Sequence, residues 1–196
     1  CRDSTIYGEC MRSLLLAGGR SSRMGRDKAL IEIGGVACIA RVAAALAAAG
    51  CEPIRIAVAQ PEDVERYGAV MPDGLDVEWV LDAVPHAGPI EALIEALTDP
   101  LVADADSIQL CPVDVPWVTA ELFFELEKTL GSGDLLAIPA DPQRSHPLLA
   151  RVRPSVASTI GDDRRPLHVQ FSEMEHSTLL TDAVILRNVN TPDDLN

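Results

Sequence analysis

The chain has 196 residues, of which 47% are hydrophobic, and it carries a formal net charge of −14 at pH 7. A chain of this length can bury the core of a single domain, and its acidity argues against nucleic acid as a partner. No apolar stretch approaches the roughly 18 residues of a membrane span, so we expect no insertion into a membrane. The acidity leaves two explanations open, a salt-rich cytoplasm and a GC-rich genome.

The cysteines and the first ten residues indicate in which cellular compartment the protein is expected. The five cysteines occur at positions 1, 10, 38, 51 and 111, without a C-x-x-C pair. An odd number with this spacing favours neither a disulfide framework nor a zinc site. We therefore expect reduced thiols in a cytoplasmic protein, with Cys38 and Cys111 packed as small apolar groups. Residues 1–10 do not have the pattern of a signal peptide, and we predict a loose extension there before a single domain over residues 11–196.

Short apolar strands alternate with helical patterns along the chain, which is typical of an α/β protein with a mostly parallel open sheet flanked by helices. The predicted strands cover residues 13–16, 54–58, 77–81, 107–111, 135–138, 147–152 and 183–187. The predicted helices cover residues 37–49, 61–70, 89–97 and 119–130, and a last helical turn begins at Thr191. Residues 161–177 are predicted to be irregular.

The first predicted strand runs into a segment suited to binding polyphosphate. Gly18 and Gly19 follow the strand and allow backbone N–H groups to approach an anion closely. Arg23 offers a planar fork to phosphate oxygens, and Lys28 offers a compact positive charge. The Walker pattern and the dinucleotide fingerprint G-x-G-x-x-G are both missing. The alternative is an ordinary surface loop with scattered charges.

Other polar residues follow later strands. Asp82 and Asp114 both come after predicted apolar strands. Ligands of open α/β sheets bind beyond the carboxyl ends of the strands. We therefore expect one crevice to hold the glycine segment and both aspartates.

Six segments in order carry a family resemblance. Residues 16–28, LAGGRSSRMGRDK, resemble the L-A-G-G-x-x-x-R-M-G-x-D-K signature of sugar-nucleotide and cofactor nucleotidyltransferases, and most closely the molybdenum cofactor guanylyltransferases. The later matches to that family are Asp82 at a strand end, the turn Gly88-Pro89-Ile90, C-P-V-D-V-P at 111–116, H-P-L-L-A at 146–150 and N-V-N-T-P-D-D-L at 188–195.

The resemblance implies a Rossmann-like nucleotidyltransferase fold and a reaction. The reaction is Mg²⁺-dependent transfer of GMP from GTP to the phosphate of molybdopterin, which forms the guanine dinucleotide cofactor and releases pyrophosphate. The implied partners are GTP, a phosphorylated pterin and, transiently, enzymes of cofactor biosynthesis or use. Two alternatives stay open. One is transfer to another acceptor, such as a sugar phosphate or a cobalamin precursor, or of a cytidylyl group; the other is a nucleotide-binding protein without turnover.

Nucleotidyl transfer asks the protein mainly to position groups and supply positive charge. Arg23 and Lys28 are expected to neutralise the β- and γ-phosphates and the leaving pyrophosphate. Asp114 is expected to anchor Mg²⁺, which prefers oxygen ligands, and Asp82 to hydrogen-bond the nucleoside. The alternatives are a turn aspartate at 114 and a cap or turn residue at 82. The expected nucleotide-binding residues are Leu16, Ala17, Gly18, Gly19, Arg23, Lys28, Asp82 and Asp114.

The resemblance also suggests an acceptor side. His146, Asn188 and Asn190 match family positions near the acceptor, and the pair Arg164-Arg165 is a candidate for docking a phosphate. The alternatives are a structural histidine, asparagines that cap the last turn, and a solvated arginine pair.

Two departures from the family pattern concern the base. Ala59 occupies the place of an asparagine that helps form the nucleoside pocket. The turn G-P-L-A-G has become Gly88-Pro89-Ile90-Glu91-Ala92, which brings the carboxylate of Glu91 close to the expected phosphate site. Neither change touches Arg23, Lys28 or Asp114, so the reaction type is better supported than the choice of base.

Overall fold

The computed structural model describes residues 12–17, 27–82, 89–100, 102, 105–190 and 194. Its strands are β1 (Ser13–Leu16), β2 (Glu32–Ile33), β3 (Val36–Ala37), β4 (Ile54–Val58), β5 (Val77–Leu81), β6 (Ile108–Pro112), β7 (Leu136–Ala140), β8 (Arg151–Val152) and β9 (His176–Leu180). Within the described residues, seven of these form one sheet in the order β5-β4-β1-β6-β8-β7-β9, and β2 and β3 form a separate hairpin.

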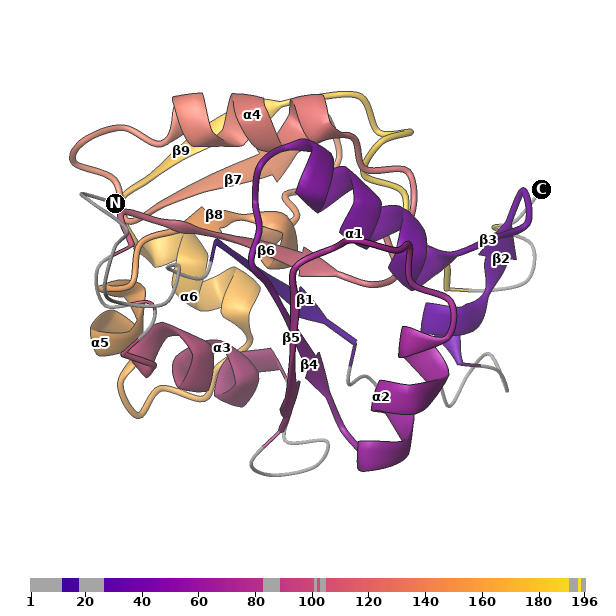
Figure 1. Ribbon diagram of the computed structural model, residues 1–196. Helices are drawn as coiled ribbons and strands as arrows, with labels where there is room; N and C mark the ends of the chain where they lie inside the picture. Colours follow the sequence, from indigo (N-terminus) through magenta and orange to yellow (C-terminus); the bar gives the residue numbers. More distant parts are fainter. Residues whose placement is uncertain are drawn as a thin grey trace.

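Helices cover both faces of the sheet. They are α1 (Cys38–Ala48), α2 (Pro61–Gly68), α3 (Pro89–Thr98), α4 (Ala120–Thr129), α5 (Val156–Ile160) and α6 (Leu167–Glu173), with 3-10 helices η1 (Lys28–Leu30) and η2 (Pro147–Leu149). Figure 1 shows α1 and α4 on one side of the sheet and α3, α5 and α6 on the other. None of the described helices is long and apolar enough to cross a membrane.

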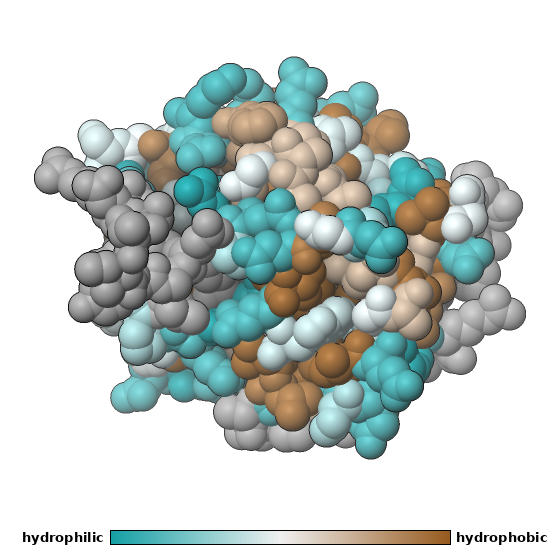
Figure 2. All heavy atoms as spheres, in the orientation of Figure 1, coloured by the Kyte–Doolittle hydropathy of each residue, from teal (hydrophilic) through white to brown (hydrophobic). Residues whose placement is uncertain are grey.

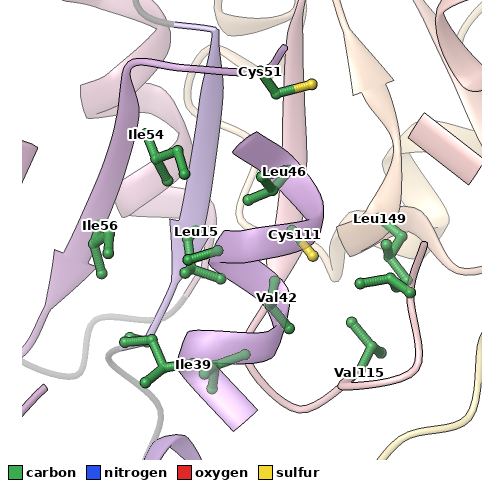
Figure 3. Close-up of a cluster of buried hydrophobic side chains, with 14 of the residues drawn as sticks. Leu15, Ile39, Val42, Leu46, Cys51, Ile54, Ile56, Cys111, Val115 and Leu149 are labelled. Atoms are coloured by element: carbon green, nitrogen blue, oxygen red, sulfur yellow. The ribbon is translucent and has the colours of Figure 1, made fainter. Parts of the chain in front are cut away.

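Successive side chains along a buried strand point to opposite faces of the sheet, and this divides the core into two clusters. Leu15 of β1 belongs to the cluster covered by α1, α2 and α4, whereas its neighbour Leu14 belongs to the one covered by α3, α5 and α6. This is the period of two that a strand buried on both faces requires. In Figure 3, side chains of α1 such as Val42 and Leu46 lie over the strands that carry Leu15 and Ile54.

The strand order creates a switch point beside β1. β4 and β6 both pair with β1 in parallel, and β5 continues in parallel beyond β4. The chain first builds outward from β1 through β4 to β5, and then crosses to β6 on the other side of β1. The carboxyl ends of β1 and β6 therefore lie together at this switch point, the place where ligands of open α/β sheets bind.

The first four core strands confirm the prediction closely. The predicted helix over residues 37–49 is α1, and it ends as expected at Gly50, whose φ of 70° favours glycine. The mostly parallel α/β architecture is confirmed. Residues 1–10 and Thr191, for which we predicted an extension and a helical turn, lie outside the described residues.

The second half of the chain differs from the prediction. The expected strand over 147–152 is the 3-10 helix η2 followed by the two-residue strand β8, because Pro147 stands at the first position of η2 and is suited to start a helical turn. The expected strand over 183–187 is a turn, in which the N–H of Ile185 donates to Asp182 O at 3.1 Å and Leu186 is fully buried. The apolar side chain of Leu186 therefore packs in the core, although its backbone belongs to no strand.

The edge strand of this half lies elsewhere. β9 pairs in parallel with β7 and begins inside the segment 161–177, which was predicted to be irregular. The same segment contains α6, whose Leu167 and Phe171 enter the core. β9 has the sequence His-Ser-Thr-Leu-Leu, which lacks the alternation of a strand, and α6 is too short for a clear helical period in the sequence.

The surface mixes polar and apolar side chains. In Figure 2, apolar residues form a central band bordered by hydrophilic ones. The most exposed large apolar side chains are Leu180, at the end of edge strand β9, and Val184. Three cysteines, Cys38, Cys51 and Cys111, are free and buried, as predicted for 38 and 111.

A buried arginine ties two strands to the α3 side of the sheet. Arg55 on β4 is 4% exposed, and its Nε donates to Glu78 of β5 at 3.0 Å while Nη2 donates to Asp99 at 2.8 Å. The two carboxylates are more exposed than the guanidinium. The buried charge is therefore the group that needs its partners most.

Removing the partners should cost more than removing the charge. We expect the double substitution Glu78→Gln and Asp99→Asn to lower the free energy of unfolding by about 3 kcal/mol, because the guanidinium stays buried without a counter-charge. Arg55→Met should cost about 1 kcal/mol, because the remaining carboxylates can hydrate. Urea unfolding of both variants measures the difference, and equal costs would contradict this account.

Candidate active site

A pocket of about 620 Å³ opens at the carboxyl ends of β1 and β6. This volume lies within the usual range for small-molecule sites. The lining residues are Leu16, Ala17, Asp27, Lys28, Ala29, Ala57, Asp82, Pro89, Ala92, Pro112, Val113, Asp114, Val115, Arg144, Ser145, His146, Pro147, Leu148, Leu149, His168 and Asn188.

Lys28 and Asp114 meet at this pocket. Lys28 opens η1, and Asp114 stands two residues after β6, where the N–H of Val113 still donates to Leu16 O at 3.1 Å. The Lys28 ammonium lies 3.1 Å from Asp114 Oδ2, and the two side chains are 22% and 20% exposed. The crevice expected from the sequence therefore brings these two residues into direct contact.

Two asparagines complete this arrangement. Asn188 Nδ2 donates to Asp114 Oδ1 at 3.2 Å, and Lys28 Nζ donates to Asn190 Oδ1 at 2.8 Å. Arg144 Nη2 donates to Asn188 Oδ1 at 3.3 Å. Both asparagines predicted from the sequence thus lie on the Lys28–Asp114 pair.

Asp27 holds the turn that leads into Lys28. Its Oδ1 accepts the backbone N–H of Ala29 at 3.1 Å, which fixes the start of η1. Its Oδ2 accepts from the Tyr67 hydroxyl and from Arg66, each at 2.9 Å. Burial and the Asp27 carboxylate raise the pKa of Tyr67, which is 3% exposed.

His146 also lines the pocket. Its Nε2 is 2.9 Å from Asp141 Oδ2, and both residues are buried. Asp141 Oδ1 also accepts the backbone N–H groups of Gln143 and Arg144. The hydrogen bond to His146, followed by these backbone bonds, lowers the pKa of Asp141. This network shapes the segment that presents Arg144 and His146 to the pocket.

Arg164 and Arg165 do not line the pocket. Arg164 Nε lies 2.6 Å from Glu91 Oε1, so the unusual carboxylate of the α3 turn pairs with this arginine. Arg165 pairs with Asp163 and Glu173. Their assignment to an acceptor phosphate stays a prediction.

The remaining predicted residues divide into three groups. Leu16, Ala17 and Asp82 line the pocket as expected. Gly18, Gly19 and Arg23 lie outside the described residues. Ala59 is buried, and Ala57, two residues earlier on β4, is the residue that lines the pocket.

Sequence reasoning missed three residues of the site: Arg144, His168 and Tyr67. Arg144 precedes the recognised H-P motif by two positions, and a basic residue there was the available signal. His168 belongs to the segment interpreted as irregular, and Tyr67 faces Asp27 only because α2 packs on the sheet.

The carboxylates fit a metal that arrives together with phosphate. Among the described residues, no group of three His, Cys, Asp or Glu side chains forms a ready metal cage. Mg²⁺ typically needs only one or two protein carboxylates when phosphates and water supply its other ligands. Asp114, partly exposed at the pocket, is a carboxylate that could serve as such a ligand.

This fold and site are those of a nucleotidyltransferase. Residues 13–167 match the family described as MobA-like NTP transferase domain, so the chain belongs to this family. A probable molybdenum cofactor guanylyltransferase of Synechococcus elongatus is 32% identical over 192 residues, which cover 93% of this chain and 94% of the relative. The molybdenum cofactor guanylyltransferase of Rhizobium rhizogenes is 27% identical, with 92% and 87% of the two chains covered.

Solved structures support the fold. Molybdopterin-guanine dinucleotide biosynthesis protein A from Archaeoglobus fulgidus has a TM-score of 0.70 at 22% identity, covering 94% of this chain and 95% of that one. A nucleotidyl transferase from Methanothermobacter has a TM-score of 0.78 at 16% identity, covering 95% and 94%. MobA-like nucleotidyltransferases generally use a divalent metal.

The Tyr67–Asp27 contact gives a pH-dependent prediction. Tyr67→Phe should lower the free energy of unfolding at neutral pH by about 1–2 kcal/mol, because Asp27 loses a buried hydroxyl donor. The pKa of Tyr67 is raised from 10.0 in the folded protein, so this advantage is full below pH 10 and shrinks as the pH rises further. Urea unfolding of both proteins from pH 8 to 11 measures it, and a constant difference would contradict the buried, neutral phenol.

Proposed function

We propose that this protein transfers GMP from GTP to the phosphate of molybdopterin, with Mg²⁺, and releases pyrophosphate. The observation that carries the proposal is the Lys28–Asp114 pair beside a pocket at the switch point of the sheet. The names of the relatives from Synechococcus and Rhizobium support the choice of donor and acceptor.

The residues at the nucleotide side have distinct tasks. Asp114 would hold Mg²⁺, which adds positive charge where the α-phosphate and the leaving pyrophosphate gain negative charge. Lys28 and Arg23 would bind the β- and γ-phosphates, and Asp82 the nucleoside. Leu16 and Ala17, with Gly18 and Gly19, would surround the nucleotide with backbone groups.

The reaction needs no separate base. An oxygen of the acceptor phosphate forms the new bond to the α-phosphorus, and the bond from that phosphorus to the bridging oxygen breaks, so pyrophosphate leaves with its electron pair. A terminal phosphate is already an anion at neutral pH. The protein therefore acts by orientation and charge neutralisation.

We assign the acceptor to the wall formed by residues 144–149 and α6. Arg144 and His146 face the pocket there, and Asn188 lies between them and Asp114. Arg164 and Arg165 would bind the acceptor phosphate only after leaving their carboxylate partners. We further propose that the enzyme works in the cytoplasm and meets the enzymes of cofactor biosynthesis or use only transiently.

Asp114→Asn should leave the fold intact and nearly abolish transfer. Loss of the metal-binding carboxylate should reduce kcat by about a thousandfold or more. The matched control is Asp106→Asn, because Asp106 is exposed just before the amino end of the same strand. Thermal melting checks the fold and pyrophosphate release measures the rate; retention of more than a tenth of wild-type turnover would contradict the role of Asp114.

A screen of substrates tests the function as a whole. Pyrophosphate release is measured with GTP, CTP, ATP and UTP in Mg²⁺, each with molybdopterin or a sugar phosphate as acceptor. We expect GTP with molybdopterin to be the best pair, with a narrow margin because Ala57, which lines the pocket on β4, offers no polar side-chain group to the base. A preference for CTP or for a sugar phosphate would move the protein to another reaction of the same fold. Nucleotide binding without release of pyrophosphate under any condition would indicate a binding protein without turnover.

A further inference from the structure

The segment that carries Asn188 and Asn190 is held against the site by buried and hydrogen-bonded neighbours. Val189 is fully buried in a small cluster with Ile31 and Cys38, and its N–H donates to Asp114 O at 2.8 Å. Arg187 lies over the ring of Trp117, 4.0 Å from its centroid. We call residues 187–190 the C-terminal strap. These anchors fix where the side chains on either side of Val189 can reach.

Asn188 is bound in one orientation. Its Oδ1 accepts from Arg144 and its Nδ2 donates to Asp114 Oδ1. Arginine can only donate and a carboxylate can only accept, so the amide cannot be turned around without losing both bonds. Asn188 thus acts on Asp114 as a donor.

Asn190 acts in the opposite sense. Its Oδ1 accepts from Lys28 Nζ at 2.8 Å, while its own backbone N–H donates to Asp194 Oδ2 at 2.8 Å. The Lys28 ammonium therefore lies between two oxygens, one of Asp114 and one of Asn190.

We propose that Asn188 and Asn190 are positioning residues of the nucleotide side: Asn188 orients the carboxylate of Asp114 by donating to it, and Asn190 orients the ammonium of Lys28 by accepting from it. The catalytic meaning of this role rests on the proposed function. The role requires different chemistry at the two positions, although the residue is the same.

Aspartate substitutions separate the two roles. Asp at 188 keeps the size of the side chain but places a carboxylate against the carboxylate of Asp114. The contact with Arg144 is kept, but it is exposed and therefore screened more strongly than the part-buried contact with Asp114. Asp at 190 keeps an acceptor, now charged, for Lys28. In buffer without metal or nucleotide, we expect Asn188→Asp to melt about 2–4 °C below Asn188→Ala. Asn190→Asp should melt at or above the temperature of Asn190→Ala. The same ranking of Asp and Ala at both positions would overturn the proposal.

A double-substitution cycle tests the partner. In an Asp114→Asn background, the difference between Asn188→Asp and Asn188→Ala should vanish or change sign, because the facing charge is gone while Arg144 still donates to the side chain at 188. If Asn188→Asp fails to fold in the wild-type background, folding regained with Asp114→Asn supports the proposal. Failure to fold in both backgrounds, or an undiminished difference, would overturn it.

Nucleotide binding provides a readout that a purely structural strap would not give. Calorimetry with α,β-methylene GTP and Mg²⁺, without acceptor, should show about two- to tenfold weaker binding for Asn190→Ala, as for one lost hydrogen bond. Asn190→Asp should bind within about twofold of wild type. Equal losses in both variants would overturn the proposal. So would unchanged nucleotide binding combined with a raised KM for the acceptor, since the asparagines would then be acceptor ligands alone.

These measurements test the proposed function separately from the positioning role of the C-terminal strap. A wild-type protein that binds no nucleotide and releases no pyrophosphate would overturn the proposed function. The melting experiments use neither substrate and still decide whether the strap orients Asp114 and Lys28.

Discussion

The contact between Lys28 and Asp114 is the interaction on which the rest of the site depends. It joins two residues that are 86 positions apart, across the carboxyl ends of β1 and β6. The contact exists because β1 and β6 pair in parallel, so that their carboxyl ends lie at the same edge of the sheet. A different strand order with the same strands would separate the two charges and leave no site.

The acidity of the chain explains why this local arrangement matters. Asp27, Asp82 and Asp114 all line the pocket, in a protein with a net charge of −14. Long-range attraction cannot draw a triphosphate to such a surface. In the proposed function, binding comes from short-range contacts with Lys28 and with a divalent cation, which would reverse the sign of the charge where phosphate binds.

The half of the sheet beyond β6 serves a different purpose. β8 is antiparallel to both neighbours, and the short η2 precedes it, so the sheet offers no second switch point there. Instead, the buried Asp141–His146 contact holds the segment whose Arg144 and His146 line the pocket, and His168 of α6 lines it as well. These residues lie on less regular structure than the parallel strands β1 and β6, because η2 and the two-residue strand β8 stand there. The Glu91–Arg164 pair also belongs to this half of the molecule. Glu91 departs from the family turn, and its negative charge is neutralised by Arg164 from the segment between α5 and α6.

The sequence by itself determined the parts that rest on local chemistry. Apolar runs ended by turn residues located β1, β4, β5 and β6, and the residue types and spacing from Gly18 to Lys28 were enough to indicate phosphate binding. An apolar run followed by a proline-flanked carboxylate placed Asp114 at a strand end for the same reason. Only the tertiary structure decided the rest: that residues 176–180 form the edge strand while 183–187 do not, and that Asn188 and Asn190 contact Asp114 and Lys28. The physical reason is that these features depend on partners far away in the chain. A strand edge is defined by β7, and an asparagine becomes a donor or an acceptor only through the group packed against it.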